Sequence, residues 1–232
     1  MQQFIDCLLY LAWALDITLL VALNTLSQNQ TTHTTRTKQL CTHLLNYCAK
    51  YPDVGLRYHA TKMILHIDFD ASYLIVPEAK SRVADYFWLQ NKSCTKINTS
   101  FLVECRTLKH VVISAAEYET AGVFYNAKTA IPIPFILNEI DHNQPPTPLI
   151  MDNNTTEKFI KNNITQKKSK SLDMRYYWLL EQSIKKRLHF QWKQYSENLA
   201  DHHTKYFPET YHKKVRMKYV TDYTSSSHSS TP

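Results

Sequence analysis

Apolar and polar side chains alternate along the chain between residues 63 and 73. The apolar positions include Leu65, Ile67 and Phe69, and the polar positions between and after them include Asp68 and Asp70. A period of two residues is typical of a β-strand with one buried face, so the pattern predicts a strand at about 63–71. A carboxylate in a sheet is costly unless it faces water, is paired, or holds a metal ion. The acidic face of this strand is therefore either a solvated surface or a candidate metal site.

Strand and helix patterns follow one another over the next 130 residues. Apolar runs at 86–89 and 101–105 follow the first strand after short links, which favours an antiparallel meander of three strands. The later predicted elements are a helix at 112–130 closed by Pro132 and Pro134, a strand at 149–151 ending in Asp152, a helix at 171–187 capped by Ser171, a strand at 189–193, and a short helix at 197–201 capped by Ser196. This order predicts an α/β domain with five strands.

The N-terminal part of the chain is rich in apolar residues at helical spacing. Asp6 and Asp16 divide the apolar stretch 4–26 into pieces that are too short to span a bilayer, so two buried helices are expected, the second capped by Asp16. A polar loop is predicted at 27–38, followed by a helix at 39–50 that ends before Pro52. There is no charged leader followed by a cleavage site, so we expect no signal peptide.

Composition points to a globular chain with a polyanionic partner. The 232 residues are 44% hydrophobic and carry a formal net charge of +7, and the positive excess is concentrated in residues 157–218. Such a basic surface suits nucleic acid or an anionic membrane. The five cysteines contain no Cys-x-x-Cys pair, and Cys41, His43 and Cys48 fit no zinc template, so a reducing, intracellular compartment is favoured.

Four carboxylates occupy distinctive positions in the predicted elements. They are Asp70 in the first strand, Glu119 in the helix at 112–130, Asp152 at the end of a strand, and Asp201 in the short helix. Four carboxylates that converge cannot all stay ionised without cations, and their oxygens are the ligands that Mg²⁺ prefers. If the fold brings them together, the sequence predicts a magnesium site.

Five sequence blocks, in this order, resemble the ribonuclease H domain of copia-type LTR retrotransposon polyproteins. The blocks are Asp70-Ala71-Ser72-Tyr73 with Ser81-Arg82, Ser114-Ala115-Ala116-Glu117-Tyr118-Glu119, Met151-Asp152-Asn153, Lys170 to Tyr176, and Glu197-Asn198-Leu199-Ala200-Asp201 with Thr204-Lys205. The resemblance implies an RNase H-like mixed five-stranded sheet flanked by helices over residues 60–207. Residues 1–56 resemble the helical C-terminal end of a reverse transcriptase, and 208–232 are expected to form a basic, then low-complexity tail.

The resemblance also implies an activity and a site. The implied activity is hydrolysis of the RNA strand of an RNA/DNA hybrid with the help of two Mg²⁺ ions, or of Mn²⁺ as the alternative ion. The implied ligands of these ions are Asp70, Glu119, Asp152 and Asp201. Asp68 and Glu117 are neighbours of two of these acids that match the family pattern less well. The residues expected to contact nucleic acid are Ser72, Asn153, Lys168, Lys170 and Arg175. These contacts would hold phosphates, and the 2′-hydroxyls would distinguish RNA from DNA.

Some features of the sequence differ from those expected of a complete, active retrotransposon polyprotein. The chain has no Asp-Asp pair, so the polymerase centre is absent, and it has only two glycines, Gly55 and Gly122, so turns must use other residues. His202 and His203 follow Asp201 and are expected at a solvent-facing helix end, with a part in product release as the alternative. A catalytically decayed, basic nucleic-acid-binding remnant of the same polyprotein is the alternative function, and a membrane-anchored protein is disfavoured by Asp16.

Overall fold

The computed structural model describes the chain except for residues 32–33, 77–79, 92–97, 109–114, 153–169 and 224–232. The chain forms two compact units. One comprises Ala60–Lys205, and the other combines Met1–His59 with Tyr206–Pro232. The described part of the expected tail, residues 208–223, therefore contributes to the same unit as the N-terminal helices.

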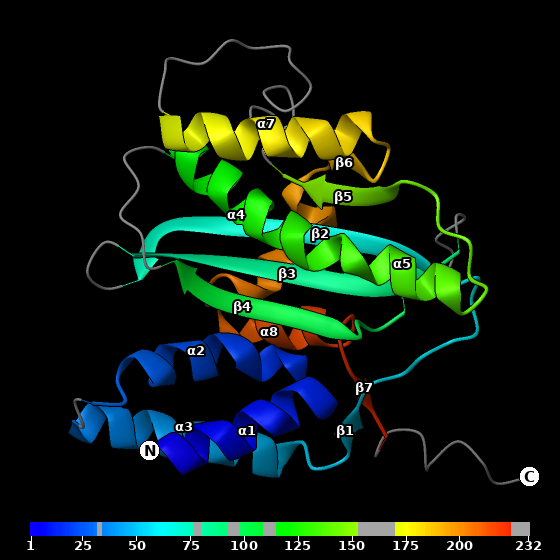
Figure 1. Ribbon diagram of the computed structural model, residues 1–232. Coiled ribbons are helices and arrows are strands. Elements are labelled where there is room, and N and C mark those ends of the chain that lie inside the picture. The colour runs from blue at the N-terminus through cyan, green and yellow to red at the C-terminus, as the bar shows by residue number, and fades with distance from the viewer. Residues whose placement is uncertain (32–33, 77–79, 92–97, 109–114, 153–169, 224–232) are drawn as a thin grey trace, which may run out of the picture. The chain divides into compact units, whose positions relative to one another are not determined.

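The unit Ala60–Lys205 is built on a mixed five-stranded sheet (Figure 1). Its strands are β2 (Ile64–Val76), β3 (Lys80–Gln90), β4 (Leu102–Leu108), β5 (Thr147–Met151) and β6 (Leu188–Trp192), in the spatial order β4-β3-β2-β5-β6. The first three strands pair antiparallel, as the predicted meander requires, and β5 lies parallel to both β2 and β6. The predicted α/β class with a five-stranded mixed sheet is confirmed.

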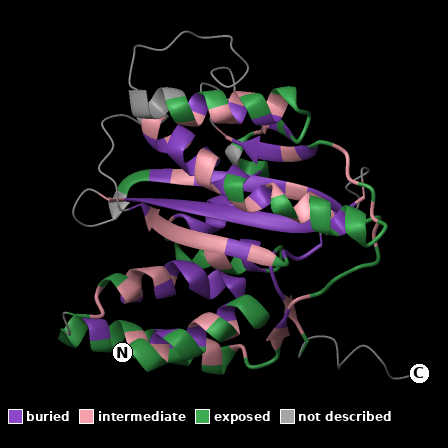
Figure 2. Ribbon diagram, in the orientation of Figure 1, coloured by how far each residue is buried: buried purple, intermediate pink, exposed green. Residues whose placement is uncertain are grey.

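Helices cover the apolar face of this sheet. They are α4 (Ala115–Ala130), α5 (Pro132–Glu139) and α7 (Lys170–Ile184); α4 packs on β2, and α7 packs on α4 and β6. The apolar residues of β2 form the core together with side chains from these helices. Figure 2 shows that β3, the strand beside β2, is buried along nearly its whole length.

Gly122 allows α4 to lie close against β2. A Cβ at this position would lie 2.5 Å from Cζ of Phe69 and 3.0 Å from Cγ1 of Val83, which is inside the normal contact distance. Any larger residue would push the helix away from the sheet. One of the chain's two glycines is therefore explained by packing, not by a turn.

Several predicted helix boundaries are wrong. Ser171 lies inside α7 and does not cap it, because Lys170 is already helical. Pro132 does follow the end of α4, but it also begins α5, since proline is compatible with the first turn of a helix. Ser196 lies within a 3₁₀ helix, η2 (Tyr195–Glu197), and Asp201 begins a second one, η3 (Asp201–His203), so two 3₁₀ helices stand where one short helix at 197–201, capped by Ser196, was expected.

Two helices end in Schellman motifs without glycine. After α7, the N–H of Arg187 donates to the carbonyl of Gln182 and the N–H of Lys186 donates to that of Ser183, both at 3.0 Å, while Lys186 has φ of 54°. After α5, Asp141 takes the corresponding position with φ of 64°. Asn, Lys or Ser was expected in such turns in place of glycine; Lys186 confirms this expectation, whereas the second turn uses an aspartate.

The other unit is mainly helical. It contains α1 (Gln2–Ala14), the 3₁₀ helix η1 (Ile17–Leu19), α2 (Leu20–Gln28), α3 (Thr35–Lys50), α8 (Glu209–Arg216), and a two-stranded antiparallel sheet of β1 (Val54–Gly55) and β7 (Thr221–Asp222). Asp16 caps η1 by accepting from the N–H of Thr18 at 3.1 Å, as predicted. The loop predicted at 27–38 is shorter, because Thr34 and Thr37 form a capping box that starts α3 at Thr35.

A buried polar network joins α8 to the N-terminal helices of this unit. The guanidinium of Arg216 donates from Nε to the hydroxyl of Tyr47 at 2.8 Å, lies 4.1 Å from the ring centroid of Tyr51, and places Nη2 3.5 Å from Oδ2 of Asp16. His212 Nε2 lies 3.1 Å from the same Tyr47 hydroxyl. Residues far apart in the sequence therefore share one core.

In the part of the chain that the structure describes, no helix has the length and apolar character needed to cross a membrane.

Candidate active site

The acidic face of β2 is buried. Asp68 is 1% exposed and Asp70 is 2% exposed, so the alternative of a solvated sheet face is wrong. Burial raises the pKa of both carboxyls, to about 7 for Asp68 and to about 6 for Asp70. Two acids at neighbouring positions on one strand face thus need partners from elsewhere in the fold.

The sheet register brings Asp152 level with Asp70. Strand β5 runs parallel to β2 with Asp68 opposite Ile150, so the residue two positions further on each strand falls at the same end of the sheet. After burial, the charge of Asp152 is the largest cause of the raised pKa of Asp70. A pair of carboxylates this close retains a proton or attracts a cation.

Asp201 interacts with both members of this pair. Its pKa is raised by burial and by the charge of Asp70, and its own charge raises the pKa of Asp152, whose largest cause is again burial. Each of the three carboxylates therefore interacts with the other two. We refer to Asp70, Asp152 and Asp201 as the acid cluster.

The segment that carries Asp201 is fastened directly to β2. Asn198 donates from Nδ2 to the backbone carbonyl of Phe69 at 2.7 Å, and the N–H of Leu199 donates to Oδ2 of Asp68 at 2.7 Å. Asp68 is thus engaged as an anchor for this segment. A buried carboxylate that accepts a backbone N–H holds the backbone more firmly than a neutral acceptor.

The far end of the same segment is held as well. The hydroxyl of Thr204 donates to Oδ2 of Asp70, and the buried guanidinium of Arg82 donates from Nη1 to the carbonyl of Thr204 at 3.1 Å. Both ends of residues 198–204 are therefore tied to β2 and β3. The position of Asp201 beside Asp70 follows from these bonds.

Lys205 supplies positive charge to the acid cluster. Its ammonium forms an ion pair with Oδ1 of Asp201. Its charge also lowers the pKa of Asp70 and of Asp152, although burial keeps both of these pKa values raised. The cluster is therefore only partly neutralised by the protein itself.

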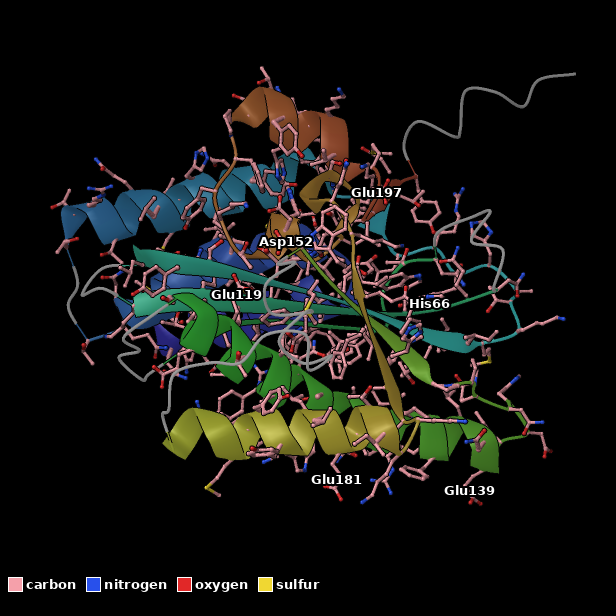
Figure 3. The ribbon with its side chains drawn as sticks, turned by 90° about the horizontal axis from the view of Figure 1, so that it is seen from above. His66, Glu119, Glu139, Asp152, Glu181 and Glu197 are labelled. Atoms are coloured by element: carbon pink, nitrogen blue, oxygen red, sulfur yellow. The ribbon has the colours of Figure 1, made fainter. Side chains whose placement is uncertain are left out.

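Glu119 lies on α4, two residues after Glu117, and is partly exposed. Its charge raises the pKa of the Tyr118 hydroxyl, behind burial and the charge of Asp70. Figure 3 shows Glu119 on the first part of α4, while Glu139 and Glu181 lie far from Asp152 on the outer helices. The structure thus joins three of the four predicted acids by direct mutual interaction and places the fourth next to Tyr118.

The residues expected to bind nucleic acid have mixed positions. Ser72 is buried on β2, and the guanidinium of Arg175 lies 5.8 Å from the ring centroid of Tyr125. Asn153 and Lys168 lie outside the described residues, as does the side chain of Lys170.

The expectation that His202 and His203 lie at a solvent-facing helix end is wrong. Both are buried, at 5% and 0% exposure, because η3 turns inward against the sheet.

The donor atoms of the acid cluster suit a hard divalent cation such as Mg²⁺, since all are carboxylate oxygens. Among the described residues, no three or more His, Cys, Asp or Glu side chains are arranged so that they could hold one metal ion together. The ligand atoms are thus of the right chemical type, but in this arrangement, in which Lys205 holds an oxygen of Asp201, the described carboxylates do not form a three-ligand metal site.

Sequence reasoning gave no role to Asn198, Thr204, Lys205 or Arg82. All four belong to the blocks on which the family resemblance depends. Their presence in these blocks was the one sequence feature that could have indicated a role for them. Their roles are hydrogen bonds and ion pairs to residues more than 100 positions away or to a neighbour one turn away, which a linear pattern does not display.

No family model matches the chain, and no curated protein matches it. Among solved structures, the chain is similar to the N-terminal RNase H domain of Rv2228c from Mycobacterium tuberculosis, with 12% identity, a TM-score of 0.43, and coverage of 61% of this chain and 91% of that one.

Two further similarities are to LC11-RNase H1 in complex with an RNA/DNA hybrid and to the prototype foamy virus protease-reverse transcriptase. The first has 8% identity, a TM-score of 0.44 and coverage of 60% and 93%. The second has 14% identity, a TM-score of 0.40, and coverage of 75% of this chain and 22% of that chain. These values do not place the chain in a family.

Proposed function

We propose that the chain is an RNase H-type nuclease that hydrolyses the RNA strand of RNA/DNA hybrids. The observation that carries the proposal is the convergence of Asp70, Asp152 and Asp201 from three elements distant in sequence. Nothing in a purely structural core requires three mutually repelling carboxylates to meet, since their burial costs stability. Perturbed acids gathered at one end of a sheet are the pattern of a functional site.

In the proposed site, Asp70, Asp152 and Asp201, with Glu119 from α4, hold Mg²⁺, with Mn²⁺ as an alternative. When bound, the ions lower the pKa of an attacking water and stabilise the leaving 3′ oxygen. The protein's contribution is to hold the carboxylates in place. Asp70 is fixed by the hydroxyl of Thr204, and Asp201 is fixed by the anchoring of its segment at Asp68 and Phe69.

The proposed substrate follows from the charge of the chain and from the sequence blocks. A net charge of +7 concentrated in residues 157–218 favours a polyanion, and such contacts do not read base sequence. Discrimination of RNA would then rest on its 2′-hydroxyls. The same blocks support an origin in a copia-type retrotransposon polyprotein, with residues 1–56 as the end of its polymerase.

The test is cleavage of an end-labelled RNA/DNA hybrid in Mg²⁺ by the full chain and by Asp70→Asn and Asp152→Asn. Both variants should lose at least about 100-fold in rate, because a metal ligand is removed. Glu139→Gln, which changes an exposed carboxylate on α5, is the matched control and should cleave normally. Equal cleavage by Asp70→Asn would overturn the site, and hybrid binding without any cleavage would favour the decayed, binding-only remnant.

A further inference from the structure

Among the described residues, three Lys–carboxylate pairs have the same spacing of four residues. Lys185 pairs with Glu181 at 2.5 Å, Lys213 pairs with Glu209 at 2.5 Å, and Lys205 pairs with Asp201. In the first two pairs both partners are well exposed, as is usual for pairs that stabilise a helix surface. In the third, the side chain of Asp201 is only 7% exposed, so this pair lies in the acid cluster and not on an open surface.

The charge at this third pair is not balanced. The lysine partners lower the pKa of Glu181 and Glu209, as expected for one positive charge next to one negative charge. The pKa of Asp201 stays raised despite Lys205, because burial and the charge of Asp70 outweigh the ammonium. A single ammonium therefore faces three carboxylates, and the cluster can accept more positive charge.

The bonds that fix the backbone next to Lys205 do not involve the lysine side chain. Thr204, the preceding residue, is held by its hydrogen bond to Asp70 and by the guanidinium of Arg82. The lysine side chain is 40% exposed and ends a flexible four-carbon stem, so its ammonium can leave Asp201 without disturbing the backbone. The ammonium of Lys205 is therefore a cation attached by a flexible side chain to a fixed backbone position.

We propose that Lys205 is a resident cation of the acid cluster, which occupies Asp201 in the cation-free protein and must withdraw before a divalent cation can bind there. The inference rests on the proposed function, because it describes the regulation of the same site. The ammonium keeps the carboxylates together when no ion is bound, and it competes with the ion for the same oxygen. Lys205 thus sets the divalent concentration at which the site is filled.

The test compares the full chain with Lys205→Met and with Lys185→Met, which removes the matched exposed pair. Calorimetric titration with MgCl₂ and with MnCl₂ should show that Lys205→Met binds the cation on the order of tenfold more tightly, a typical magnitude for the coupling between two binding events. Lys185→Met should bind like the unmodified chain. Equal or weaker binding by Lys205→Met, including no binding by either protein, would overturn the proposal.

A second measurement works without any added ion. In a chelator, Lys205→Met should unfold several degrees below the unmodified chain, because the buried carboxylates lose the positive charge of this ammonium, and excess MgCl₂ should remove the difference. Lys185→Met should unfold within about 2 °C of it. Melting of Lys205→Met at the temperature of Lys185→Met would also overturn the proposal.

These outcomes separate the two proposals. Tighter cation binding by Lys205→Met, with no hybrid cleavage by any protein, would leave Lys205 as the resident cation and reject the nuclease. Cleavage that depends on Asp70, with no gain in cation affinity in Lys205→Met, would keep the nuclease and reject the role of Lys205.

Discussion

The backbone N–H of Leu199 donates a 2.7 Å hydrogen bond to Oδ2 of Asp68, which lies 131 residues earlier in the chain. This bond explains why β2 carries two buried acids two residues apart. Asp70 belongs to the acid cluster, whereas Asp68 holds the segment that brings Asp201 to it. The two acids therefore have different roles on the same strand face.

Replacing Asp68 should separate these roles. Asp68→Ala leaves the buried N–H of Leu199 without its acceptor and should lower the free energy of unfolding by about 1–3 kcal/mol. Asp68→Asn keeps an oxygen in place and should lose less than about 1 kcal/mol. Urea unfolding measures both. An equal loss for Asp68→Asn and Asp68→Ala would mean that the carboxylate charge, and not the acceptor oxygen for the N–H of Leu199, is what matters.

The acid cluster predicts a pH dependence of stability. The pKa of Asp70 is raised to about 6 in the folded chain by burial and by Asp152, so the folded state holds its proton where the unfolded chain has already lost it. Stability should therefore be highest below about pH 4 from this group's contribution and should fall as the pH rises to about 6, then level off.

The control for this pH dependence is Asp70→Asn, which cannot ionise. Its free energy of unfolding should vary less between pH 4 and 7 than that of the unmodified chain, and at pH 8 in chelator it should be the more stable protein. Thermal unfolding across this pH range measures the difference. The same slope in both proteins would show that Asp70 does not titrate as its surroundings indicate.

Gly122 should not tolerate a larger side chain. Gly122→Val places atoms within contact distance of Phe69 and Val83, so it should cost about 1–3 kcal/mol in the free energy of unfolding. Lys128→Ala, an exposed change on the same helix, should stay within about 0.5 kcal/mol of the unmodified chain. A neutral Gly122→Val would mean that α4 can move away from β2 at no cost.

Lys186→Gly should make the protein more stable. Lys186 has φ of 54° at the end of α7, a conformation that costs a residue with a Cβ about 1–2 kcal/mol. Glycine avoids this cost but loses more entropy on folding, so a net gain of about 0.5–1 kcal/mol is expected. Lys185→Gly, one residue earlier, lacks this positive φ and should not stabilise. Chemical denaturation of the two variants gives the comparison.

The contacts of α8 should be needed for the stability of the N-terminal helices. Arg216→Met removes the guanidinium that contacts Tyr47, Tyr51 and Asp16, and leaves the buried Asp16 uncompensated. We expect a loss of about 3–5 kcal/mol, seen by far-ultraviolet circular dichroism as earlier thermal unfolding. Lys218→Met, an exposed change nearby in the sequence, should have no such effect.

Local patterns in the sequence were sufficient for the order and type of most elements. The alternation around Asp70 predicted β2, and the short apolar run before Asp152 predicted β5, because strand periodicity is a property of neighbouring residues. The helix ends were predicted less well. The expected cap at Ser171 failed because a serine before an apolar stripe is a common feature, and packing of the whole helix decided where α7 begins.

The sequence by itself determined the strands and helices and the acidic residues they carry. It also supplied the family blocks that pointed to Asp70, Glu119, Asp152 and Asp201. Only the tertiary structure decided that Asp68 and Asp70 are buried, that Asn198, Thr204 and Arg82 fasten the segment of Asp201, and that Lys205 lies in the cluster. The physical reason is that these bonds join backbone and side-chain atoms of distant residues. Whether an acid is solvated, paired or used as an anchor depends on which atoms the folded chain places around it.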